Sequence, residues 1–101
     1  PAWDRAERYR RLMAEGRHQS VRSLSRAIRE DFSKITRALK ILELPVTVLE
    51  ALRRHGDDTR VRAHFTEKRL RAALAGPYPQ DVLAEIQAVL QDAGSPALQI
   101  S

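Results

Sequence analysis

Apolar residues recur every three or four positions along almost the whole chain, and this spacing limits the possible folds more than any other feature. The period places them on one face of an α-helix, whereas a half-buried strand needs strict alternation, which no segment shows. Breaks at Gly16, Pro45, Gly56 and Gly76-Pro77 separate most of the helices. We therefore expect an all-α fold, a compact bundle of about six helices with short connections.

Each expected helix carries one apolar stripe. Ser20, Asp31 and Thr59 are residue types that cap helix starts, so we expect the second, third and fifth helices to begin there, the fifth running on through Leu74. In chain order the six stripes are Trp3, Ala6, Tyr9, Leu12 and Met13; Val21, Leu24, Ala27 and Ile28; Ile35, Ala38, Leu39 and Leu42; Val46, Leu49 and Leu52; Val61, Phe65 and Leu70; and Val82, Leu83, Ile86, Val89 and Leu90. We expect the sixth helix to close the core, with a subunit contact as the alternative.

The chain has 101 residues, the size of one domain. We expect a single helical domain over residues 1–94, followed by a disordered tail at residues 95–101. Because cysteine is absent, disulfides and thiolate zinc sites are excluded. No apolar run approaches the roughly 20 residues that a membrane span needs. We therefore expect no membrane contact and a cytoplasmic location.

Positive charge is concentrated in the first three-quarters of the chain. The 18 Lys and Arg outnumber the 13 Asp and Glu, and every basic residue lies between Arg5 and Arg71. Residues 72–101 carry only acidic charges. A basic surface of this kind suits a polyanion, because binding it to phosphates releases condensed counterions. The alternative is a set of solvated surface arginines.

The segment from about residue 20 to residue 42 has the spacing of a helix-turn-helix. Its first helix would pack through Leu24, which a small residue follows, and through Ile28. Its second would pack through Ile35, 11 positions beyond Leu24, and through Leu39 four positions later. Two short helices crossing around a tight turn need such a frame, and the second helix of this motif enters the major groove of DNA.

Outside that frame the second helix presents a polar and basic face. Arginine and lysine can reach guanine acceptors, and hydroxyl groups can reach bases or phosphates. The side chains that we expect to enter the groove are Ser33, Lys34, Thr36, Arg37 and Lys40. The alternative is two ordinary bundle helices with charged outer faces.

Two residues depart from the usual motif in its turn. Arg29 stands where glycine is usual, and Glu30 stands where an apolar residue is usual. We expect Phe32 to supply the missing apolar contact of the turn.

The string KITRALKILELP, residues 34–45, followed by VTVLEAL, resembles the recognition helix and the next helix of ParB/KorB-type partition proteins. YRRLMAEGRHQS upstream and GDDTRVRAHF downstream extend the resemblance over residues 9–74. It implies the central helix-turn-helix domain of a DNA segregation protein, bound to palindromic or repeated centromere-like (parS-like) sites in double-stranded DNA. It also implies a nucleoid- or plasmid-associated location, a homodimer formed through a region outside this chain, and a partition ATPase as a possible partner.

The resemblance also implies roles for residues around the motif. Gln19 and Ser20, with Arg22 beside them, would hold phosphates at the start of the first motif helix. An auxiliary contact that determines specificity would come from Arg60 or Arg62.

Family members carry an N-terminal nucleotide-binding region and a C-terminal dimerisation region, and neither is evident in this sequence. We therefore expect an excised central domain, an interpretation that the first residue, Pro1, also favours. An intact protein that has lost its initiator methionine is the alternative.

No residue pattern indicates catalysis. His18, His55 and His64 lack the spacing of metal ligands, and Asp57-Asp58 is typical of a loop that leads into a helix. No glycine-rich phosphate loop or serine–histidine arrangement is present. We expect a protein that is not an enzyme and holds no metal or cofactor. Two other functions stay open, namely a transcriptional repressor with the same motif and a helical protein-interaction module with an acidic partner.

Overall fold

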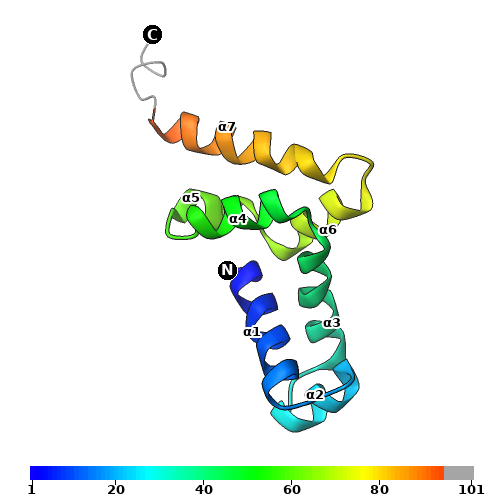
Figure 1. Ribbon diagram of the computed structural model, residues 1–101. Helices are drawn as coiled ribbons and strands as arrows, with labels where there is room; N and C mark the ends of the chain where they lie inside the picture. Colours follow the sequence, from blue (N-terminus) through cyan, green and yellow to red (C-terminus); the bar gives the residue numbers. More distant parts are fainter. Residues whose placement is uncertain (95–101) are drawn as a thin grey trace.

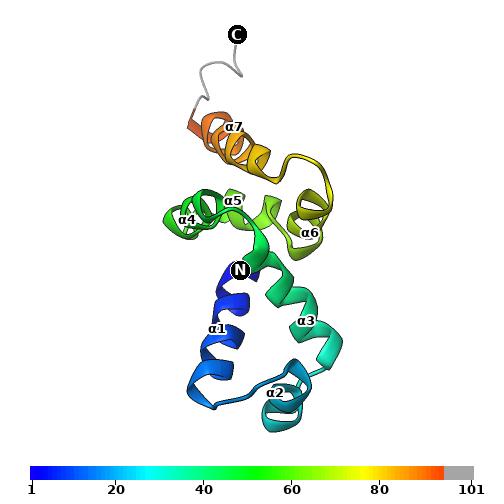
Figure 2. The same cartoon turned by 45° about the vertical axis from the view of Figure 1, so that its right-hand side comes forward.

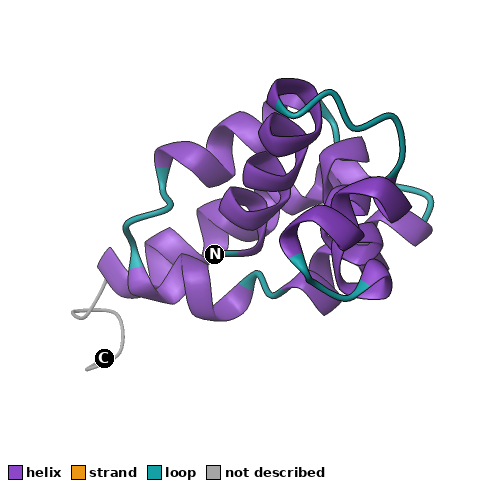
Figure 3. Cartoon of the chain, turned by 90° about the horizontal axis from the view of Figure 1, so that it is seen from below, coloured by secondary structure: helices purple, strands orange, loops and turns teal. Residues whose placement is uncertain are grey.

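The computed structural model describes residues 1–94, which form seven α-helices and two short 3-10 helices without a strand (Figure 3). The α-helices are α1 (Ala2–Glu15), α2 (Val21–Ile28), α3 (Phe32–Lys40), α4 (Val46–Arg54), α5 (Thr59–His64), α6 (Glu67–Ala75) and α7 (Val82–Gly94), and the 3-10 helices are η1 (Ile41–Glu43) and η2 (Pro79–Asp81). The predicted all-α fold is confirmed. The predicted tail lies outside the described residues.

The helices form two packed groups. α1 and α3 lie side by side, and α2 crosses one end of this pair (Figures 1 and 2). α4, α5 and α6 lie at the other end, where α7 packs on α4 and α5. Across residues 1–94, none of the helices combines the length and the apolar content that crossing a membrane requires.

Two clusters of buried side chains hold these groups together, and α1 contributes to both. The smaller cluster consists of Ala6, Tyr9, Leu24, Ile35 and Ala38. The larger cluster consists of Ala2, Trp3, Ile41, Leu44, Val48, Leu49, Leu52, Val61, Phe65, Leu70, Val82 and Ile86. The buried side chains of α7 confirm that the sixth predicted helix closes the core. Two members of the predicted stripes, Ala27 and Val46, are exposed instead.

The predicted fifth helix is wrong in its extent, because the chain forms two helices there. α5 ends at His64, Phe65 leaves the helical conformation, and Thr66 caps α6 by accepting a hydrogen bond from the backbone N–H of Arg69 at 3.3 Å. Asp58, rather than the predicted Thr59, caps α5. Each cap satisfies an amide that a helix start would otherwise leave without a partner. The three side chains of the predicted stripe are all buried.

Candidate nucleic-acid interface

α2 and α3 form the two helices of the predicted motif, and both begin at the predicted caps. The hydroxyl of Ser20 accepts from the backbone N–H of Ser23 at 3.1 Å, and the carboxylate of Asp31 accepts from that of Ser33 at 3.0 Å. Figures 1 and 2 show α2 crossing the end of α3. The caps and the shared buried cluster fix where each helix starts and which face it turns outward.

The turn between the two helices has left-handed backbone geometry at Arg29, with φ 57° and ψ 42°. Glycine adopts this conformation without strain, whereas the Cβ of Arg29 makes it unfavourable in conformational energy. Ser25 stabilises the turn, since its hydroxyl donates to the carbonyl of Glu30 at 2.5 Å and its carbonyl accepts from the N–H of Glu30 at 3.2 Å.

The carboxylate of Glu30 replaces the apolar contact that this position usually makes. The buried Tyr9 of α1 donates its hydroxyl to that carboxylate, and Arg8 lies 3.7 Å from it. The hydrogen bond from Tyr9 lowers the pKa of Glu30, while burial, followed by that bond, raises the pKa of Tyr9. Phe32, expected to fill the turn, is instead 41% exposed with the guanidinium of Arg22 5.1 Å from its ring centre.

The five side chains predicted to enter the groove are all exposed along α3. They are Ser33, Lys34, Thr36, Arg37 and Lys40. Ile35 and Ala38, on the opposite side of the helix, are fully buried. This outward set therefore forms one polar and basic surface, which we call the α3 face.

Two residues of the α3 face are engaged locally. The hydroxyl of Thr36 donates to the carbonyl of Phe32 at 2.9 Å, and the ammonium of Lys40 lies 3.2 Å from the carboxylate of Glu43. Both contacts stay within one or two turns of helix, so they leave the α3 face open to a partner.

Arg37 forms the long-range contact of the α3 face. Its Nε lies 3.5 Å from Oε1 of Glu67, the first residue of α6. The same carboxylate lies 3.8 Å from Arg5 of α1 and 3.5 Å from Arg71 of α6. Three arginines from three helices therefore converge on one acidic residue beside the α3 face.

The start of α2 presents the side chains predicted to hold phosphates. Gln19, Ser20 and Arg22 are exposed there. A shallow surface hollow of about 420 Å³ lies at this helix start, lined by His18, Ser20, Arg22, Ser23, Arg26 and Ala27. The position of Arg22 beside Phe32 joins this hollow to the start of α3.

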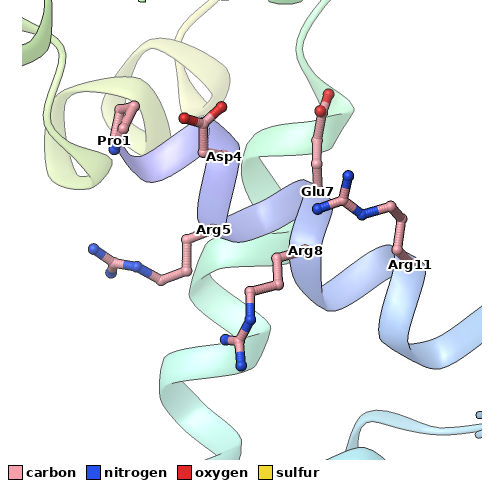
Figure 4. A pocket seen from close by; sticks show the side chains of 6 residues that line it. All are labelled: Pro1, Asp4, Arg5, Glu7, Arg8 and Arg11. Carbon is pink, nitrogen blue, oxygen red and sulfur yellow. The ribbon is translucent and has the colours of Figure 1, made fainter.

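The outer side of α1 carries mixed charge. Figure 4 shows Arg5 and Arg8 extending to the same side of the helix, where they line an open hollow together with Pro1, Asp4, Glu7 and Arg11. The carboxylate of Glu7 accepts a 2.6 Å hydrogen bond from Arg53 of α4. This edge is therefore basic but interrupted by carboxylates.

Arg60 and Arg62 stand apart from the α3 face. The guanidinium of Arg60 makes 2.8 Å and 3.2 Å contacts with the carboxylate of Asp58, and it holds the pKa of that carboxyl well below its usual range. Arg62 lines a hollow with Pro1 and Thr59. Both belong to α5, which packs on α7. The basic residue that α6 brings to the α3 face is Arg71.

Glu67 and Arg71 were not among the predicted site residues. An available signal was the pair Thr66-Glu67, since threonine followed by an acidic residue is typical of a helix start. A second helix start after Phe65 would have separated the two helices that the apolar stripe joined.

No family model, curated protein or solved structure matches the chain. Within the described residues, no three His, Cys, Asp or Glu side chains lie close enough together to hold a metal ion.

Proposed function

We propose that this chain binds double-stranded DNA in a sequence-specific manner, with α3 entering the major groove. The observation that carries the proposal is the division of α3 into two sides. Ile35 and Ala38 are fully buried, while the polar and basic α3 face is exposed. A short helix anchored in this way can insert its outer side chains among base edges without unfolding the domain.

The arrangement around α2 supports the same function. Ser20 and Arg22 lie at the start of α2, next to the start of α3, where a DNA backbone passes when a recognition helix enters the groove. Contacts with phosphates would fix the register of the domain on the duplex, and contacts from the α3 face would read the bases.

The resemblance of residues 9–74 to ParB/KorB-type proteins supports a more specific role. In this role the chain is the centromere-binding domain of a DNA partition protein, which recognises a palindromic site as a homodimer and works with a partition ATPase. Repression of transcription needs the same DNA contacts, so the location of the natural sites would distinguish the two roles.

Selection of bound sequences from a random duplex pool tests the proposal. We expect enrichment of a defined motif, bound at about 150 mM salt at least about a thousandfold more tightly than a scrambled duplex. Absence of enrichment, with weak binding of every sequence that disappears as salt rises, would contradict sequence-specific recognition. That outcome would favour the protein-interaction module.

A further inference from the structure

The contacts of Glu67 connect the α3 face to the rest of the fold. Its carboxylate lies within 3.8 Å of nitrogen atoms of Arg5, Arg37 and Arg71. The side chain of Glu67 is 19% exposed, whereas that of Arg37 is 47% exposed. Glu67 is therefore the more firmly enclosed member of the pair, and Arg37 extends from it toward solvent.

The start of α6 gives Glu67 a fixed position. Thr66 caps the helix, and α6 packs against both α3 and η1. A carboxylate in the first turn of a helix is favoured by the helix dipole. By contrast, Glu43, which pairs with Lys40 at the end of α3, is 59% exposed and interacts only three residues away.

We infer, on the basis of the proposed DNA binding, that Glu67 is a positioning residue that determines specificity by orienting Arg37 toward a base. The ion pair between them is made through Nε of Arg37. A guanidinium can keep this contact while its two terminal amino groups bind the O6 and N7 acceptors of guanine. Holding the side chain in advance removes part of the entropy cost of ordering a long arginine on binding.

The charge of Glu67 has a second effect on DNA binding. A carboxylate beside the α3 face repels phosphates, so it weakens binding to every sequence alike. Glu67 therefore lowers the affinity for DNA in general and raises the discrimination between sequences. The correct base compensates for the repulsion through its contact with Arg37, whereas a wrong base does not.

The Glu67→Gln variant of the 101-residue chain separates these two effects. The measurement is the dissociation constant for the selected duplex and for a scrambled duplex of equal length, at one salt concentration. We expect the variant to bind the scrambled duplex more tightly than wild type does, and the ratio of the two constants to fall at least about fivefold. Glu67→Asp, which keeps the charge at the helix start but is one methylene shorter, should also lower the ratio.

Two further variants serve as controls. Glu43→Gln removes the same charge near the same end of α3, and we expect it to strengthen both complexes and leave their ratio unchanged. In an Arg37→Ala background, Glu67→Gln should no longer change the ratio, because the side chain that it positions is gone. Circular dichroism and thermal melts establish that each variant is folded.

Three outcomes would overturn the inference. In the first, the ratio of the two dissociation constants is unchanged by both Glu67→Gln and Glu67→Asp. In the second, Glu43→Gln lowers this ratio as much as Glu67→Gln does. In the third, Glu67→Gln lowers the ratio as much in the Arg37→Ala background as in the wild type. A wild-type chain without any sequence preference would instead overturn the proposed function, and the inference with it.

Discussion

The hydroxyl of Tyr9, buried on α1, donates a hydrogen bond to the carboxylate of Glu30 in the turn between α2 and α3. The two residues are 21 positions apart in the sequence. The bond fixes the turn of the motif to the helix that lies beside α3, so the position of α2 depends on a side chain outside the motif.

Replacing Tyr9 with phenylalanine should lower the melting temperature at neutral pH by about 4–8 °C, because a part-buried hydrogen bond to a charged acceptor is lost. The pKa of Glu30 is lowered in the fold, so the contribution of the bond is complete above the ordinary value of 4.5 and is lost as the pH falls further. Thermal melts at several pH values check this. A difference between wild type and variant that stays constant down to about pH 2 would contradict the assignment.

Arg29→Gly should stabilise the protein. The left-handed conformation costs an ordinary residue about 1–2 kcal/mol, and the greater entropy of glycine in the unfolded chain offsets about half of this gain. We expect a rise of roughly 4 °C in the melting temperature. Arg29→Ala removes the same side chain but keeps the strain, so it should show no such rise. Equal melting temperatures for the two variants would argue against strain at this turn.

Arg37→Ala should strongly reduce the preference for the selected duplex while leaving helical content nearly unchanged, because Arg37 is exposed and the buried side chains of α3 are Ile35 and Ala38. The expected loss on the selected duplex is about 1–3 kcal/mol, with little change on a scrambled one. Arg54→Ala, on α4, is the matched change of charge. Normal discrimination by Arg37→Ala would show that the α3 face is assigned wrongly.

Arg11→Ala should weaken binding to all sequences by a similar factor, because we expect the basic outer side of α1 to contact phosphates rather than bases. The logarithmic dependence of affinity on salt should flatten by about one unit for one lost phosphate contact. Arg53→Ala is the control, because Arg53 already donates a hydrogen bond to Glu7. We expect it to leave the salt dependence of the affinity unchanged. An unchanged slope for Arg11→Ala would exclude this edge from the interface.

Asp58→Asn should reduce stability most at neutral pH. Arg60 lowers the pKa of Asp58 in the fold. The ion pair between them therefore stabilises the fold fully above the ordinary pKa of 3.8, and this stabilisation declines as the pH falls below that value. Asparagine keeps the capping acceptor and removes only the charge. Melting temperatures of wild type and variant should converge in acid, and divergence there would contradict the pairing.

The sequence predicts most of the local structure because local rules decide it. The spacing of Leu24 and Ile35 and the caps Ser20 and Asp31 are sufficient to locate α2 and α3. The break at Phe65 escaped prediction because one apolar stripe continues through both α5 and α6.

The contacts around the α3 face escaped prediction for a different reason. Tyr9 meets Glu30, and Arg5, Arg37 and Glu67 meet, only after α1, α3 and α6 have packed together. A one-dimensional pattern marks which residues are charged. It does not say which charges from distant helices become neighbours.

Because α1 supplies Trp3 to one buried cluster and Tyr9 to the other, no boundary within residues 1–94 separates the two clusters into independent units. Truncation after Leu44 would remove most of the side chains that pack with Trp3 in the larger cluster. Deletion of the first ten residues would remove buried side chains from both clusters. α1 therefore links the end of the fold that α2 and α3 form to the layer that α7 closes.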